Sequence, residues 1–304
     1  SGEHPLMGAT DVCPLVPIAN IEMDEVVKYA HKLGERVGKE LGIPGYFYEY
    51  AASTEERRNL AVVRKGEYEA LKAKLVDPQW QPDFGPAEFV KAKHTGATAI
   101  SARDFLIAYN VNLNTTSTRR ANAVAYDIRE KGRIKRVGEV LSGDIVKDAD
   151  GNTLWTPGKL KHVKAIGWFI EEYGVTQVTM NITNITETPL HLAFDETAKA
   201  ANARGIRATG SELVGLVPKS AMLEAGKYFL RKQNRSTGIH ESELIKIAIK
   251  SMGLDELGPF IPEERIIEYM LESGTDKKLV DLSLTDFANE TASESPAPGG
   301  GSIS

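Results

Sequence analysis

The stretch FLIAYNVNL (Phe105–Leu113) decides the fold prediction, because it joins two series of secondary-structure elements. Its aromatic and β-branched residues are typical of a β-strand. It closes a first series, β-α-β-α-loop-β, and precedes a second, α-β-β-α-β-α. These two orders predict an α+β fold made of two α/β layers, each with helices packed on a mixed β-sheet.

The first series begins with a short apolar run at 11–18, in which two prolines favour an edge strand over a central one. A helix is predicted over 22–41, because apolar residues recur there at steps of three and four. Asn20 can cap this helix and Gly42 can end it. Two further elements are expected, a strand at 46–50 and a helix at 67–75.

The second series begins with a helix that starts at Ser117 or Thr118 and runs to about residue 130. Residues 131–160 are rich in Gly, Lys and Asp and predict an exposed excursion. Thr188-Pro189 predicts a helix start, with the hydroxyl as cap and Pro at the first helical position. The other expected elements are strands at 162–171, 175–183 and 206–217, and helices at 219–232, 241–252 and 262–271.

Composition excludes several classes of protein. The chain has 304 residues with 37 Lys+Arg against 42 Asp+Glu, a net charge of −5, and a pI near 5.8, which argues against binding nucleic acid through phosphate neutralisation. No apolar run reaches the roughly 20 residues of a membrane helix, and no signal peptide opens the chain. A single cysteine, Cys13, excludes a disulfide framework. We therefore expect a reducing, cytoplasmic setting.

Both ends of the sequence indicate a piece of a longer polypeptide. The chain opens on SGEHP (1–5) without an initiator Met. It stops within a proline- and glycine-rich run, SPAPGGGSIS (295–304).

His4 is the candidate catalytic residue, in the small-residue segment GEHPLMGATD (2–11). An imidazole can take up and return a proton near neutral pH. An exposed histidine before a strand more often has no such role, so the local sequence leaves both interpretations open. No metal site is predicted, because the sequence has no His-Glu-X-X-His. A calcium-loop-like run at 148–152 has Lys159 where a bidentate Glu belongs.

A second candidate site is the segment GATAISARDF (96–105), whose small residues let a flat heterocycle approach the backbone. Arg103 offers a bidentate fork for a carboxylate. A close-packed turn with an Arg–Asp pair explains the same residues equally well. The segment GSELVGLVP (210–218) also contains small residues that leave the backbone accessible. It precedes a predicted helix start, which can hold an anion.

These segments together resemble the formiminotransferase domain of the bifunctional formiminotransferase-cyclodeaminases, folate enzymes of histidine degradation. The resemblance covers essentially the whole chain. It is carried by the motifs at 2–14, 66–69, 82–86, 96–98, 102–103, 105–113, 166–168, 210–218, 264–269 and 295–302.

The resemblance implies transfer of the formimino group from N-formimino-L-glutamate to tetrahydrofolate as co-substrate, without a metal. It implies His4 as general acid/base and a homodimer of transferase domains. It also implies two ferredoxin-like subdomains, at 1–113 and 114–272, with folate bound between them, followed by a linker and the beginning of a cyclodeaminase domain at 273–304. The folate-binding residues it implies are Gly96, Ala97, Thr98, Ala99, Ile100, Ser101, Ala102, Arg103, Asp104 and Phe105.

Relative to the family pattern, we expect the first elements of the N-terminal subdomain to precede Ser1, and therefore weak or no transferase activity from this chain alone. We assign it no deaminase activity, because only the opening of that domain is present. Both substrates carry carboxylates, for which Arg103 is the first candidate partner and Arg64 the second.

Two other functions are compatible with parts of the sequence. A non-catalytic module that binds a regulatory small molecule can use paired ferredoxin-like layers, but it has no need of a proton shuttle at His4. An amidine hydrolase would use water in place of folate, and it would not need the heterocycle site at 96–105.

Overall fold

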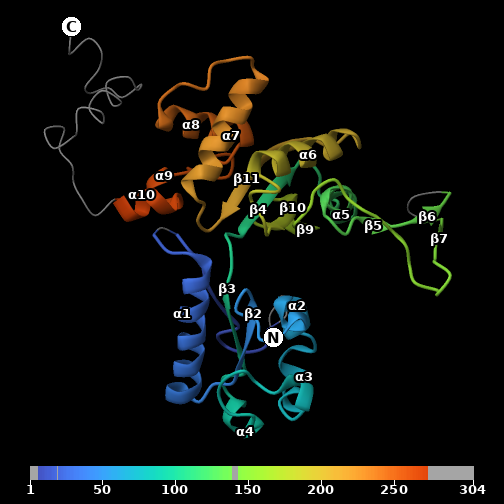
Figure 1. Ribbon diagram of the computed structural model, residues 1–304. Helices are drawn as coiled ribbons and strands as arrows, with labels where there is room; N and C mark the ends of the chain where they lie inside the picture. The colour runs from blue at the N-terminus through green and yellow to red at the C-terminus, as the bar shows by residue number, and fades with distance from the viewer. Residues whose placement is uncertain (1–5, 19, 139–142, 273–304) are drawn as a thin grey trace, which may run out of the picture. The chain divides into compact units, whose positions relative to one another are not determined.

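The structure is a computed structural model that describes residues 6–18, 20–138 and 143–272. His4 and the predicted linker at 273–304 lie outside the described residues. The chain divides into two compact units, Ser1–Asp104 and Phe105–Ser304, and Figure 1 shows their elements. No helix in the described ranges is long and apolar enough to cross a membrane.

The first unit is built on a three-stranded parallel sheet in the order β1-β3-β2. Its strands are β1 (Val12–Leu15), β2 (Gly45–Glu49) and β3 (Thr98–Ala102). The predicted edge strand is therefore confirmed as β1. Parallel sheets are stable when both faces are covered, and here they are: α1 (Met23–Arg36) packs on one face, and α2 (Leu60–Val63) with α3 (Glu67–Lys74) on the other.

The helix predicted over 22–41 is confirmed in extent. It consists of α1 followed by a π-helical turn, η1 (Val37–Leu41), and ends at Gly42, whose φ of 65° is left-handed. Asn20 does not cap it, because Glu22 occupies the N-cap and makes no side-chain cap hydrogen bond. The remaining short elements of this unit are η2 (Glu55–Arg58), η3 (Pro78–Trp80) and α4 (Phe89–Ala92).

The second unit contains a four-stranded sheet in the order β11-β4-β10-β9, with every neighbouring pair antiparallel. The strands are β4 (Ile107–Leu113), β9 (Val163–Ile170), β10 (Val175–Ile182) and β11 (Ala208–Val214). Two helices, α5 (Thr118–Ile128) and α6 (Leu190–Asn202), contribute buried residues to the same core as one face of this sheet. The other helices are α7 (Lys219–Lys232), α8 (Glu241–Met252), α9 (Pro262–Arg265) and α10 (Ile267–Glu272).

In the second unit, the sequence predicted the N-cap of α5 correctly and that of α6 wrongly. The Ser117 side chain caps α5 by accepting from the Arg120 backbone N–H at 3.4 Å. Thr188 does not cap α6, because its hydroxyl donates to the carbonyl of Lys161 at 2.7 Å. Pro189 takes the N-cap position instead, and the helix begins one residue later.

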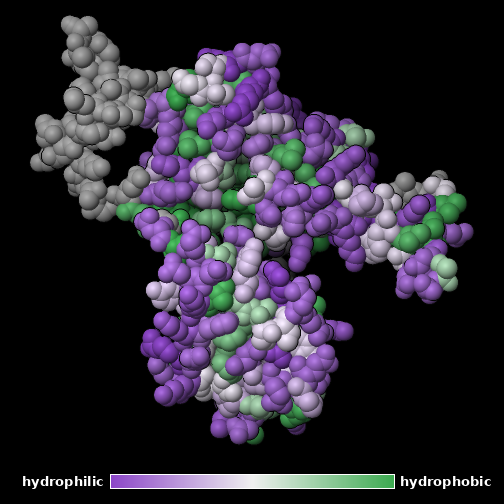
Figure 2. Space-filling model, viewed as in Figure 1, coloured by the Kyte–Doolittle hydropathy of each residue, from purple (hydrophilic) through white to green (hydrophobic). Residues whose placement is uncertain are grey.

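The described residues of the excursion predicted at 131–160, which are 131–138 and 143–160, are mostly exposed, as predicted. It carries two pairs of short antiparallel strands, β5 (Arg133–Ile134) with β8 (Trp155–Thr156), and β6 (Arg136–Val137) with β7 (Asp144–Ile145). Figure 2 shows apolar residues gathered on this arm. They include Val137, Ile145 and Trp155, which are all more than a third exposed.

Two sequence predictions about the layers need correction. Each main sheet is of one type, parallel in the first unit and antiparallel in the second, whereas a mixed sheet was expected in both. The strand at 107–113 was assigned to a first subdomain ending at residue 113. It lies instead between β11 and β10, so the first unit ends at Asp104. The linear order of strands does not show which sheet a strand joins, because that depends on long-range pairing.

Candidate functional site

The segment that follows His4 in the chain lies against the start of the predicted ligand-binding segment. Gly8 and Gly96 form an antiparallel bridge. On either side of it, the N–H of Ala9 donates to the carbonyl of Thr95 at 2.8 Å, and the N–H of Ala97 donates to the carbonyl of Met7 at 3.1 Å. Two segments that sequence reasoning selected separately are thus joined backbone to backbone.

This close approach requires glycine on both sides. A Cβ on Gly8 would lie 2.3 Å from the carbonyl oxygen of Ala97, and a Cβ on Gly96 would lie 2.4 Å from Gly8 Cα. Gly96 also has φ +69°, a left-handed conformation that side-chain-bearing residues rarely adopt. The two glycines therefore set the position of the segment that leads back to His4.

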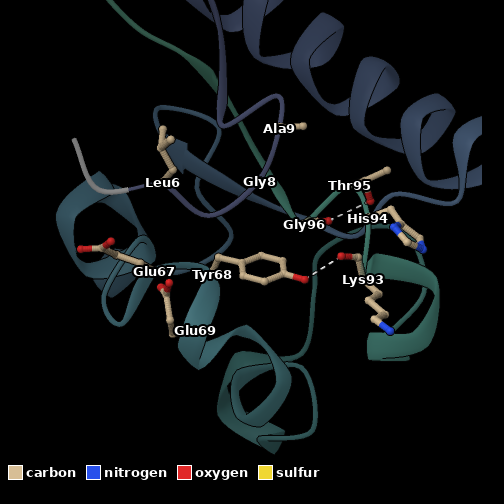
Figure 3. A pocket seen from close by; sticks show the side chains of 10 residues that line it. All are labelled: Leu6, Gly8, Ala9, Glu67, Tyr68, Glu69, Lys93, His94, Thr95 and Gly96. Atoms are coloured by element: carbon tan, nitrogen blue, oxygen red, sulfur yellow. Dashed lines mark hydrogen bonds between the residues drawn. The ribbon is translucent and has the colours of Figure 1, made fainter. Parts of the chain in front are cut away.

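A pocket of about 270 Å³ opens beside this bridge. Figure 3 shows the side chains around it, which come from the segment 6–9, from α3 and from the chain ahead of β3. Its lining combines charged and polar side chains with small and apolar residues and comprises Leu6, Gly8, Ala9, Glu67, Tyr68, Glu69, Lys93, His94, Thr95 and Gly96. Its volume is below the roughly 300–1,000 Å³ of pockets that enclose a whole drug-sized ligand. It can hold one end of a larger substrate.

Two hydrogen bonds order the wall of this pocket. The Tyr68 hydroxyl donates to the carbonyl of Lys93 at 2.6 Å, which links α3 to the segment after α4, and Thr95 Oγ1 donates to the carbonyl of Gly96 at 3.2 Å (Figure 3). His94 and the carboxylates of Glu67 and Glu69 supply groups that can exchange protons. His94 lies two residues ahead of Gly96 and was not singled out by the sequence analysis.

A buried carboxylate, that of Asp11, holds residues 7–11 in place. Asp11, 8% exposed, accepts a hydrogen bond from the backbone N–H of Met7 at 2.7 Å and forms an ion pair with Arg64. Arg64 was expected to bind a substrate carboxylate. Its guanidinium instead pairs with the chain's own Asp11, so its observed role is to position residues 7–11.

The turn expected at 96–105 is not a turn over most of its length. Residues 98–102 form β3, the central strand of the parallel sheet, and their side chains are at most 4% exposed. Their backbone groups belong to the ladders with β1 and β2, and cannot read the edge of a heterocycle. Small residues are needed here because helices pack closely on both faces of the strand.

Only the two ends of this segment remain accessible to a ligand. Gly96 borders the pocket at one end. At the other end, Arg103 donates to the backbone carbonyl of Asp104 at 3.0 Å, and the Asp104 carboxylate accepts from the Tyr50 hydroxyl at 3.2 Å. Within the described ranges, no group of three or more His, Cys, Asp or Glu residues is arranged to hold a metal ion.

The sequence of this chain matches the models of a known family. The model of the formiminotransferase domain, N-terminal subdomain, matches residues 1–103, and that of the formiminotransferase domain matches residues 108–272. The chain belongs to the formiminotransferase family.

Individual relatives agree with this assignment. The chain is 46% identical to formimidoyltransferase-cyclodeaminase of Gallus gallus and 41% identical to that of Dictyostelium discoideum, over 99% and 100% of its length. It spans only 52% of each of these relatives, about half their length. It is also 38% identical to glutamate formimidoyltransferase of Thermoplasma acidophilum, over 81% of this chain and 73% of that protein.

Proposed function

We propose that this chain transfers the formimino group of N-formimino-L-glutamate to tetrahydrofolate, forming 5-formiminotetrahydrofolate and L-glutamate. The observation that carries the proposal is the match to glutamate formimidoyltransferase of Thermoplasma acidophilum over most of both chains. The contact between Gly8 and Gly96 supports it, because this contact links the segment after His4 to the segment implied in folate binding.

The proposed chemistry needs one group that moves protons between two nitrogens. N5 of tetrahydrofolate attacks the formimino carbon and loses its proton, giving a tetrahedral carbon that bears three nitrogens. The nitrogen of glutamate leaves only after it gains a proton, because an amide anion is a poor leaving group. His4 is proposed to take the first proton and deliver the second, a contribution of about 10²–10⁴-fold in rate. Alignment of the two substrates supplies much of the remaining acceleration.

For folate, we propose contacts at the two ends of the segment 96–105 rather than along it. The backbone around Gly96 borders a pocket large enough for one end of the molecule. Arg103, half-buried after the last residue of β3, remains the candidate partner for a substrate carboxylate. The side chains from Thr98 to Ala102 then support the site from inside the core.

For the architecture, we propose the ferredoxin-like topology in the second unit. Its elements follow the order β4-α5-β9-β10-α6-β11, and the spatial order is β11-β4-β10-β9. The strands β1, β2 and β3 of the first unit are parallel, so their order does not support a ferredoxin-like topology there. A homodimer, and a linker beginning near residue 273, are also proposed from the family resemblance.

The direct test replaces His4 by Ala and measures turnover and folate binding separately. We expect formiminotetrahydrofolate production to fall about 10²–10⁴-fold, with an unchanged Kd for 5-formyltetrahydrofolate by calorimetry. His162→Ala, an exposed histidine of the second unit, is the matched control and should retain full turnover. Turnover is measured in the full-length protein that contains residues 1–304, because weak or no transfer is expected from this chain alone. Unchanged turnover in His4→Ala would refute the role of His4, and no transfer by the full-length protein would refute the proposed activity.

A further inference from the structure

The sheet face of the second unit that lies away from the α5–α6 core carries a polar row. On β4, Tyr109, Val111 and Leu113 enter the core, so Asn110 and Asn112 lie on the opposite face. In register, Gln177 of β10 lies opposite Asn112, and Glu212 of β11 lies opposite Asn110. These four side chains therefore share one face of the sheet, across three adjacent strands.

Hydrogen bonds connect these four side chains in one network. Asn110 Nδ2 and Gln177 Nε2 each donate to Glu212 Oε2 at 3.3 Å. Gln177 Nε2 also donates to Asn112 Oδ1 at 2.8 Å, and Asn112 donates to the carboxylate of Glu256. Gly210 makes room for that carboxylate, since a Cβ there would lie 2.5 Å from Glu256 Oε2.

Two amide oxygens of this row receive no hydrogen bond within the described ranges. Asn110 and Gln177 are 5% and 1% exposed, yet their amide oxygens accept no hydrogen bond from any residue in the described ranges, whereas both amide nitrogens donate. Neither oxygen is among the fully enclosed side-chain atoms of the described residues that lack a partner, so each keeps some surface open to a donor from outside the protein. A ligand that only donates hydrogen bonds would satisfy these oxygens.

The row also carries negative charge without a counter-ion. Glu212 is half-buried, and neither it nor Glu256 forms an ion pair with a residue of the described chain. The negative charge is felt locally, because the carboxylate of Glu212 is the main cause that raises the pKa of the nearby Tyr173 phenol. A half-buried carboxylate with amide oxygens beside it favours a planar cation with several N–H donors.

We propose that Glu212, with the amide oxygens of Asn110 and Gln177, binds the protonated formimino group of N-formimino-L-glutamate. The inference rests on the proposed function, since it assigns the site for one substrate of that reaction. A protonated formimino group is an amidinium, which is planar, cationic and only a donor. Trp168, opposite Gln177 in the register, adds a buried indole N–H without a partner in the described residues, which can donate to a carboxylate of the same substrate.

The site would also distinguish formimino from formyl. N-formyl-L-glutamate has nearly the same shape, but it presents a carbonyl oxygen where the formimino group presents N–H donors. That oxygen would face the Glu212 carboxylate without a hydrogen bond. Loss of a hydrogen bond to a charged group corresponds to at least about tenfold in affinity. Glu212 is therefore proposed as a specificity-determining residue, not as a proton-transfer group.

The test compares both ligands on the full chain by calorimetry. We expect N-formimino-L-glutamate to bind at least about tenfold more tightly than N-formyl-L-glutamate, and Glu212→Gln to reduce that ratio to about one. The substitution is isosteric and keeps an oxygen for the amides of Asn110 and Gln177. Glu224→Gln removes the same charge from an exposed residue of α7 and should leave the ratio unchanged. Adding Asn110→Asp to Glu212→Gln returns a carboxylate to the row and should restore the preference.

The outcomes separate this inference from the proposed function. An unchanged ratio in Glu212→Gln, failure of Asn110→Asp to restore it, or no binding of either compound by the folded chain overturns the inference. Transfer of the formimino group to tetrahydrofolate is measured separately on the full-length protein that contains this chain. If the formimino group is transferred but the affinity ratio of the two ligands does not depend on Glu212, only the inference is refuted. A chain that binds through Glu212 without transfer refutes only the proposed function.

Discussion

Gly8 and Gly96 face each other across an antiparallel bridge in which neither has room for a Cβ. The bridge joins the segment that follows His4 to the strand at the centre of the first sheet. Hydrogen bonds from Ala9 and Ala97 flank it on both sides. The arrangement depends on backbone contact, so it is sensitive to changes that leave side-chain chemistry untouched.

Gly96→Ala should destabilise the first unit by about 3 kcal/mol or more, since left-handed strain of about 1–2 kcal/mol adds to a steric clash. Its Cβ would meet Gly8 Cα and Met7 O, both at 2.4 Å. Gly174→Ala is the control, because Gly174 has φ +64° but no atom within 4 Å of its Cβ. Chemical denaturation followed by circular dichroism measures both. Equal losses would show that φ alone, not the close approach, sets the cost.

Arg57→Met should cost about 3–5 kcal/mol of unfolding free energy. Arg57 is 7% exposed, pairs with Asp83 at 2.6 Å and donates to the carbonyls of Gln79 and Gln81 at 3.0 Å. Its removal leaves the Asp83 carboxylate buried without its counter-ion.

The control for this variant is Arg36→Met, which breaks an exposed, solvent-screened ion pair with Glu40 and should leave the denaturant midpoint nearly unchanged. Denaturant midpoints of the two variants give the comparison. If Arg57→Met lost as little as Arg36→Met, the buried pair would not be a main support of the first unit.

The stability of the second unit should fall in mild acid through His191. Burial lowers the pKa of His191 from 6.5 in spite of nearby Glu224 and Asp195, and its ring stacks on Tyr228 at 4.3 Å. The folded state therefore favours the neutral ring, while the unfolded chain binds a proton near the ordinary pKa. The unfolded state then holds more protons, so stability is retained above about pH 6.5 and is lost below it.

Urea midpoints at several pH values on either side of the ordinary histidine pKa measure this effect. His191→Gln should flatten the decrease, because glutamine does not titrate. His240→Gln, on a histidine that caps α8, is the comparison. An identical pH dependence in the wild type and His191→Gln would contradict the assignment.

Lys74 should lose its proton at unusually low pH. Burial, and then the charge of Arg57, lower the pKa of Lys74 to about 8, although its ammonium lies 4.0 Å from the centre of the Trp80 ring, a contact that favours the charged form. NMR of ¹³C-labelled lysine side chains measures the midpoint, and Arg57→Met should raise it. A midpoint at the ordinary 10.5 would contradict the prediction.

Local patterns predicted the elements more successfully than their partners. The helix over 22–41 and the strands near 163–170 and 175–182 were predicted because apolar spacing and β-branched content depend only on neighbours in sequence. The segment 96–105 was predicted as a ligand-binding segment or a close-packed turn, because small residues let a ligand or another part of the chain approach the backbone. Those residues serve the close packing of helices on both faces of β3, which the local sequence does not reveal.

The candidate sites show the same limit. Gly8 and Gly96 were both within segments that the sequence singled out, but their contact was not predictable without the fold. Asn110 and Glu212 lie in segments that the sequence singled out, 105–113 and 210–218, but nothing local linked them to each other or to Gln177. Their common face becomes visible only when the register of three strands is known.

The sequence by itself determined the family, the charge balance and most of the helices and strands, because these depend on residue identity and on interactions between near neighbours. Only the tertiary structure decided that the strand at 107–113 belongs to the second sheet, that Arg64 pairs with Asp11, and that Glu212 shares a face with two amides. These relationships join residues far apart in the chain. They arise from the pairing and burial that stabilise the whole fold, which no local stretch of sequence specifies alone.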